Sequence, residues 1–137
     1  MKHIIDVRIY YEDTDAGGIV YYANYLKFAE RGRTELLRQI GFENTKIRDD
    51  YGAIFVVRHI EIDYLKPAVL DDALQLETSI IEFKNSSFIM RQNVVRDGEI
   101  ITDMRVTMVC IDAKLYRPVR LPENVKEAFQ VYVENVE

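Results

Sequence analysis

Residues 21–41 read YYANYLKFAERGRTELLRQIG, and this stretch decides the fold. Small and apolar residues recur in it at the spacing of one helix face, namely Tyr21, Tyr25, Phe28, Ala29, Gly32, Leu36 and Ile40. Gly41 follows the last of them and predicts the end of the helix. Gly32 should weaken the helix by roughly 1 kcal/mol relative to alanine, so we expect it where the helix closely approaches a sheet.

Segments on both sides of this helix alternate with the period of a β-strand. Ile5, Val7 and Ile9 alternate with polar residues before the helix. The strands expected after it cover residues 54–64, 74–80, 88–94 and 100–112. The first of these should present one core face, interrupted by Arg58 and made of Ile54, Val56, Ile60, Ile62 and Tyr64. Turns are expected at residues 84–86 and, as a two-residue hairpin, at Asp97 and Gly98.

A strand, a long helix and then four mostly antiparallel strands predict an α+β fold in a single domain covering residues 1–137. The economical packing is a sheet curled around the long helix. Pro122 stands near the start of a final short helix. The apolar residues expected on that helix are Val125, Phe129, Tyr132, Val133 and Val136.

The composition narrows the possible functions. The formal charge of −5 argues against a general role on nucleic acid, which calls for a basic surface. No segment has the apolar length needed to cross a bilayer, and Asp6 interrupts the run that a signal peptide would need, so we expect a cytoplasmic protein. The single cysteine, Cys110, shares strand parity with Val106 and Met108 and should be a buried structural thiol.

The segment before the helix carries the candidate chemistry, and residues 12–18 read EDTDAGG. The N–H groups at a helix N-terminus bind anions and developing oxyanions. Gly17 and Gly18 have no Cβ, so a ligand can approach the backbone there. A carboxylate on this loop could act as base or nucleophile on a carbonyl whose oxygen rests on those N–H groups.

Other interpretations of the same residues were weighed. Asp13 or Asp15 could simply cap the turn or the helix. A calcium loop starting at Asp13 would need glutamate at its twelfth position, where Asn24 stands. A metal site at Asp13 and Asp15 with Glu12 is possible, but no second cluster of histidine and carboxylate ligands supports it. A serine triad is disfavoured because the chain has no G-x-S-x-G motif.

Residues 13–25, DTDAGGIVYYANY, resemble the 4-hydroxybenzoyl-CoA thioesterase family. The most similar branch is that of the acyl-CoA thioesterases encoded with the bacterial Tol-Pal envelope system. The likeness continues through residues 33–38, 56–58, 67–72 and 97–98. It implies a hotdog fold, an antiparallel sheet wrapped around one long central helix, in chains that form homodimers or homotetramers.

The resemblance also implies roles for particular residues. Asp15, the second aspartate of D-x-D, is the expected catalytic carboxylate, and the backbone N–H of Tyr22 is expected to polarise the thioester carbonyl. The Tol-Pal branch usually has histidine at the position of Tyr22, and the hydroxybenzoyl enzymes have tyrosine there. Gly17 and Gly18 are expected to lie against the substrate.

Residues 82–88, EFKNSSF, match a CoA-binding segment of the family. By this resemblance Lys84 and Ser87 contact the phosphates of CoA, and Arg117 and Arg120 could add positive charge nearby. Each of the four could equally be an ordinary surface residue.

The sequence therefore predicts hydrolysis of acyl-CoA or acyl carrier protein thioesters, with Asp15 as general base or nucleophile. No metal or organic cofactor is expected, since a thioester is already activated and a carboxylate with N–H donors suffices. A hydratase on the same fold would want histidine five residues after Asp15, where Val20 stands. A non-catalytic acyl-binding or scaffold protein is the other alternative. An oligomer is expected because apolar residues share the strand parity that faces away from the helix, namely Phe55, Val57, Ile81, Ile89 and Val109.

Overall fold

The computed structural model describes residues 1–134, so Val136 of the expected last helix lies outside the described residues. The helices and strands are β1 (His3–Arg8), α1 (Asn24–Gln39), α2 (Asn44–Tyr51), β2 (Ala53–Tyr64), β3 (Ala73–Phe83), β4 (Ser87–Arg96), β5 (Glu99–Asp112) and α3 (Glu123–Phe129). Two short 3-10 helices, η1 (Tyr11–Asp13) and η2 (Gln130–Tyr132), complete the described elements.

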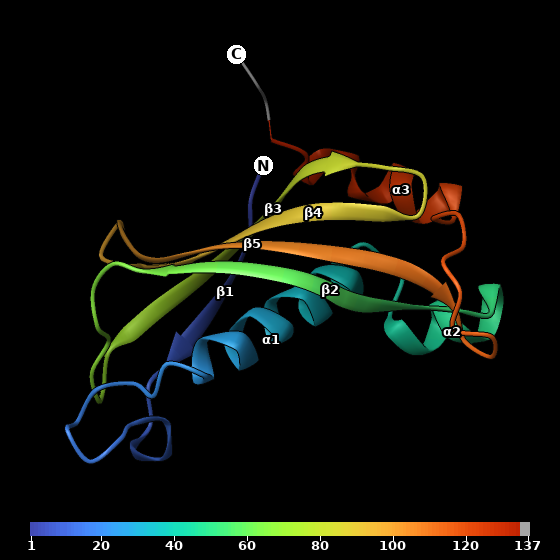
Figure 1. The fold of residues 1–137 in the computed structure, drawn as a ribbon. Coiled ribbons are helices and arrows are strands. Elements are labelled where there is room, and N and C mark those ends of the chain that lie inside the picture. The colour runs from blue at the N-terminus through green and yellow to red at the C-terminus, as the bar shows by residue number, and fades with distance from the viewer. Residues whose placement is uncertain (135–137) are drawn as a thin grey trace.

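The five strands form one sheet in the order β1-β3-β4-β5-β2, and every neighbouring pair is antiparallel. Helix α1 runs along one face of this curved sheet, while α2 and α3 lie toward the end where the β3–β4 turn is found (Figure 1). The arrangement confirms the α+β fold and the sheet curled around the long helix.

Helix α1 forms because its apolar stripe can be buried against the sheet, and Phe28, Ala29 and Leu36 are at most 1% exposed. Gly32 marks the closest approach: a Cβ at this position would lie 2.6 Å from Cδ2 of Leu76 on β3. That distance is too short for any side chain, so the packing reason expected for this glycine is confirmed.

The inner face of β2 differs from the predicted one. Val57 pairs with Met108 of β5 and the next pair along β2 begins at His59, so Arg58 is the extra residue of a β-bulge. Because a bulge shifts the alternation by one residue, Phe55 and Val57 lie on the side of α1 together with Ile60, Ile62 and Tyr64. The prediction that Phe55 and Val57 face away from the helix is therefore wrong, as is the assignment of Val56 to the core face.

The other outward apolar residues are less exposed than predicted. Ile81 falls at a second bulge, between the β3–β4 pairs formed by Ile80 and Glu82. Ile89 is partly buried and Val109 is 5% exposed within the single chain. An apolar outer face is therefore a weaker argument for an oligomer than the sequence indicated.

The predicted turns agree with the structure. Asp97 and Gly98 both have positive φ, 51° and 79°, and close the β4–β5 hairpin. Gly41 has φ 84° and its N–H donates to the carbonyl of Arg38, which confirms it as the helix stop. Cys110 is fully buried, and burial raises the pKa of its thiol to about 11, as a structural cysteine requires.

Two helix boundaries and one additional helix differ from the expectation. Helix α1 begins at Asn24 rather than at Tyr21, because the preceding residues form a turn. Helix α2 was not predicted, since its eight residues bury only Ile47 and show no apolar stripe. Helix α3 ends at Phe129, and Val133 forms a bridge with Ile80 of β3 instead of a further helical turn.

Candidate functional site

Asp15 lies in a short hairpin between η1 and α1. Its N–H donates to the carbonyl of Ile19 at 2.9 Å, and its own carbonyl accepts from the N–H of Gly18 at 3.0 Å. Gly18 has φ 81°, which closes a three-residue hairpin loop with a residue in the left-handed region. The two glycines thus build a hairpin ahead of the helix rather than its first turn.

The carboxylate of Asp15 folds back over this hairpin. The N–H of Gly17 donates to Oδ1 of Asp15 at 2.8 Å, and a Cβ on Gly17 would lie 3.2 Å from that oxygen. The hydrogen bond fits the turn-capping interpretation. The side chain is exposed, and its second oxygen, Oδ2, has no hydrogen-bond partner within residues 1–134. One oxygen fixes the orientation while the other is open to a proton or an acyl group.

The hairpin is attached to the body of the protein through the segment before β3. The N–H of Val20 donates to the carbonyl of Ala68 at 2.9 Å, and Ile19 forms a β-bridge with Val69. The N–H of Ala68 in turn donates to the hydroxyl oxygen of Tyr25 at 3.2 Å. Tyr25 is 3% exposed in the first turn of α1, and burial raises the pKa of its phenol.

Tyr22 lies two residues before the first residue of α1, next to the N-cap Ala23, so its backbone N–H is near the positive end of the helix dipole. The hydroxyl of Tyr64 donates to the carbonyl oxygen of Tyr22 at 3.2 Å, and the two rings pack edge to face with centroids 6.3 Å apart. No acceptor for the N–H of Tyr22 is found among the described residues. This N–H is therefore available to a carbonyl oxygen from a ligand.

Asp13 ties the hairpin to the start of the helix. Its carbonyl accepts from the N–H of Tyr21 at 3.0 Å and from Nδ2 of Asn24 at 2.8 Å. Its carboxylate accepts from the N–H of Tyr10 at 2.8 Å, a structural role within η1. The structure thus brings Asp15 and Tyr22 to one corner of the molecule, with Gly17 and Gly18 in the same hairpin.

Lys84 and Ser87 lie elsewhere, in and beside the β3–β4 turn. The side chain of Lys84 is exposed, whereas Ser87 is only 5% exposed. Ser87 pairs with Val109 of β5, which pairs in turn with Val56 of β2. Tyr64, beside the hairpin, is eight residues further along β2 than Val56, a separation of about 26 Å at the usual rise per residue. One chain therefore does not bring Lys84 and Ser87 to Asp15.

The two arginines considered for the CoA site follow β5. The N–H of Leu121 donates to the carbonyl of Asn85 at 3.1 Å, which joins this segment to the β3–β4 turn. The N–H of Asp112 donates to the carbonyl of Arg117. The side chains of Arg117 and Arg120 are both exposed. Together with Lys84 they form a basic end of the molecule.

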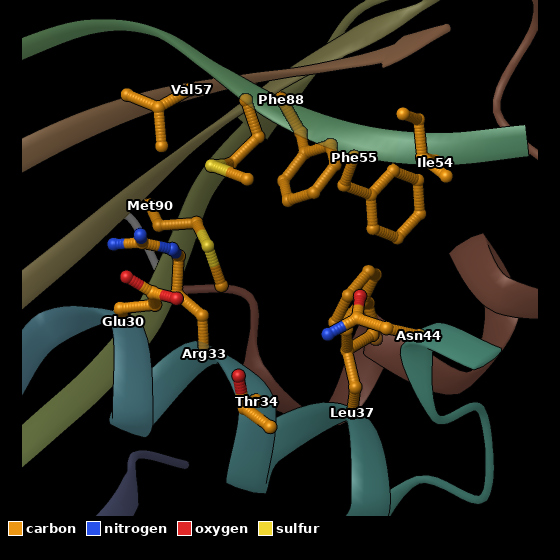
Figure 2. A pocket seen from close by; sticks show the side chains of 12 residues that line it. Glu30, Arg33, Thr34, Leu37, Asn44, Ile54, Phe55, Val57, Phe88 and Met90 are labelled. Carbon is orange, nitrogen blue, oxygen red and sulfur yellow. The ribbon is translucent and has the colours of Figure 1, made fainter. Parts of the chain in front are cut away.

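A cavity of about 370 Å³ lies between α1 and the inner face of the sheet, within the size range of small-molecule sites (Figure 2). Most of its wall is apolar or aromatic, and its lining includes Leu37, Phe55, Val57, Phe88, Met90 and Phe129. The polar part of the lining consists of Glu30, Arg33, Thr34 and Asn44.

Arg33 was missed by the sequence reasoning. Its Nη1 donates to Oε1 of Gln92 at 2.9 Å, and Gln92 is fully buried, with Nε2 donating to the carbonyl of Ala29 and to Oγ1 of Thr78. Burial lowers the pKa of the Arg33 guanidinium, and the charge of Glu30 opposes this shift. A charged residue on a helix normally indicates the solvated face, and the position of Arg33 next to Gly32 was the available signal.

Within residues 1–134, no group of three or more histidine, cysteine or acidic side chains is placed to hold a metal ion. The described helices include none with the length and apolar character needed to cross a membrane.

Comparison with known proteins identifies the family. Residues 9–129 match the model of the thioesterase-like superfamily. The chain is 42% identical over 123 residues to the acyl-CoA thioesterase YbgC of Haemophilus influenzae, with 90% of each chain covered. It is 39% identical over 125 residues to the acyl-CoA thioester hydrolase YbgC of Escherichia coli O6:H1, covering 90% of this chain and 92% of that one.

Among solved structures, a probable thioesterase from Bartonella henselae superposes with a TM-score of 0.83 at 37% identity, covering 89% of this chain and 100% of that one. These matches confirm the resemblance and the hotdog fold. The chain belongs to the thioesterase-like superfamily.

Proposed function

We propose that this protein hydrolyses acyl-CoA thioesters, with the carboxylate of Asp15 as general base or nucleophile. The observation that carries the proposal is that Asp15 and Tyr22 lie in the same corner. Within residues 1–134, one carboxylate oxygen of Asp15 and the N–H of Tyr22 have no hydrogen-bond partner. The relatives named above act on acyl-CoA and cover nearly the whole chain.

The chemistry needs only groups that the chain supplies. The thioester carbonyl oxygen accepts from the N–H of Tyr22, and the hydroxyl of Tyr64 positions this residue through a hydrogen bond to its carbonyl oxygen. The helix dipole stabilises the developing negative charge. Asp15 either takes a proton from the attacking water or attacks the carbonyl carbon itself to form a mixed anhydride that water then opens. In both routes the C–S bond breaks and the thiolate of CoA takes up a proton, leaving a free acid.

We also propose that the working enzyme is at least a homodimer, joined along β2. Within residues 1–134, β2 pairs only with β5, so its second edge of twelve residues has no strand partner. An open edge of this length favours pairing with another chain, and a two-fold axis would make the added pair antiparallel. Such a pair places the Asp15 end of one chain beside the Lys84 end of the other, so that both could contact one CoA molecule.

The second candidate function is acyl binding without catalysis. It is favoured by the hydrogen bond from Gly17 to Asp15, which is what a purely structural aspartate would form. A scaffold of this kind would bind acyl-CoA without releasing a thiol.

A panel of acyl-CoA and acyl carrier protein thioesters, assayed by free-thiol release, distinguishes the two functions and the two carriers. We expect turnover on acyl-CoA that rises in proportion to enzyme concentration. Binding without release of any thiol would establish the second candidate function instead. A cytoplasmic location is part of the same proposal, and a dimer or tetramer is checked by sedimentation.

A further inference from the structure

We propose that the cavity beside α1 binds the distal end of the acyl group, and that Arg33 selects acyl groups ending in a carboxylate. This inference rests on the proposed function and names the substrate class of its site: CoA thioesters of dicarboxylic acids. No relative named above is described as acting on such thioesters.

Arg33 carries its charge at a partly buried position. Its side chain lies on the cavity wall beside Met90, with Glu30 three residues before it on α1 (Figure 2). Burial lowers the pKa of the guanidinium, and the charge of Glu30 opposes this shift. Within residues 1–134 no carboxylate lies within 4.0 Å of its nitrogens. Partial removal of a guanidinium from water without a direct ion pair is costly, and an anion entering the cavity would offset that cost.

The guanidinium of Arg33 is held in a fixed orientation. Gln92 holds Nη1 through its Oε1, and Gln92 cannot turn freely because its Nε2 is bound to Ala29 and Thr78. Gln92 thus occupies one donor of a group that has five, and the others can serve a ligand. A planar donor held in this way matches the two oxygens of a carboxylate, and the resulting charge-assisted hydrogen bonds are strong.

The rest of the cavity lining is mostly apolar. Phe55, Phe88 and Phe129 form an apolar wall that suits methylene groups. The cavity therefore combines a chain-binding part with one partly buried cation. Glu30 is the acidic residue of the lining, but it is exposed and forms no ion pair with Arg33. Its negative charge therefore weakens the attraction of the cavity for an anion without cancelling it. Removing the charge of Glu30 should strengthen that attraction, whereas removing the charge of Arg33 should weaken it.

The test compares matched substrates in matched variants. The kcat/KM values for adipoyl-, suberoyl- and sebacoyl-CoA are divided by those for hexanoyl-, octanoyl- and decanoyl-CoA, in the wild type and in Arg33→Met, Arg33→Lys and Glu30→Gln. Because each ratio is taken within one variant, a general loss of activity or stability cancels. The length series samples three distances between the thioester and the terminal carboxylate.

We expect the ratio to exceed one in the wild type at the length that reaches Arg33. Arg33→Met should lower it by about tenfold to a hundredfold, the usual worth of hydrogen bonds to a charged group. Arg33→Lys should keep part of the preference, and Glu30→Gln should increase it. A wild-type ratio at or below one at every length, or a ratio that Arg33→Met leaves unchanged, overturns the inference while the proposed thioesterase function stands.

A binding measurement keeps the inference testable without turnover. Calorimetric titration with free sebacate and free decanoate should show tighter binding of the diacid to the wild type, and this difference should disappear in Arg33→Met. Equal affinities for the two acids in the wild type contradict the inference. If no acyl-CoA is hydrolysed but the diacid preference holds, the proposed function fails and the carboxylate site remains.

Discussion

The Asp15 hairpin and the cavity beside α1 are built in different ways. The hairpin is exposed, and backbone hydrogen bonds and glycine conformations hold it in place. The cavity is formed by side chains from α1, α2, β2, β4, β5 and α3 that meet only in the folded protein. Substitutions in the hairpin should therefore change turnover more than stability. Substitutions in the packed region, where α1 lies against the sheet, should change stability more than turnover.

The largest expected effect on stability is that of Gly32→Val in the packed region. Since a Cβ here already lies 2.6 Å from Leu76, the larger side chain must push α1 away from the sheet, and the free energy of unfolding should fall by about 3 kcal/mol. Urea denaturation measures this loss. Gly41→Ala is the matched control, because it has open space but a φ of 84°, and it should cost only about 1 kcal/mol. Equal losses in the two variants would contradict close packing at Gly32.

A smaller effect is expected for Tyr25→Phe, because Tyr25 belongs to both regions. Its ring packs in the core, and its hydroxyl holds the segment to which the hairpin is attached. Removing the hydroxyl leaves the N–H of Ala68 without its acceptor, so stability should fall by about 1–2 kcal/mol. Amide hydrogen exchange within residues 14–20 should also become faster. Unchanged exchange there would show that the hairpin does not depend on Tyr25.

The smallest effect is expected for Lys84→Ala at the basic end. A phosphate contact far from the reacting carbon contributes alike to ground and transition states, so KM for acyl-CoA should rise about threefold to tenfold with little change in kcat. The increase should shrink with added salt because exposed charges are screened. Lys2→Ala, which removes the same charge elsewhere, serves as the control. An unchanged KM at low salt would remove Lys84 from the substrate site.

The contrast between the regions also explains what the sequence could predict. Local sequence patterns were sufficient to predict several features. These are the helix stripe, the close packing at Gly32, the hairpin at Asp97 and Gly98, and the family motif around Asp15. The inner face of β2 was assigned wrongly because one bulge residue, Arg58, reverses the alternation without any signal in the pattern.

The remaining differences depend on contacts between distant segments. Helix α2 has no apolar stripe, and it is recognisable only from the burial of Ile47 against the rest of the protein. Arg33 looks like a surface charge until Gln92 of β4 is placed beside it. The separation of Lys84 from Asp15 likewise follows from strand register, which local sequence does not specify.

The most direct test of the account is the turnover of Asp15→Asn measured beside its melting temperature, with Asp13→Asn as the control. Asparagine can still accept the hydrogen bond from Gly17, so the melting temperature should change little. Loss of the carboxylate should lower kcat on acyl-CoA by roughly 10²–10⁴-fold, the usual worth of a positioned base. Asp13→Asn, at a carboxylate that caps η1, should lose far less activity. A folded Asp15→Asn protein with near-normal kcat would contradict the mechanism and leave Asp15 as a turn residue only.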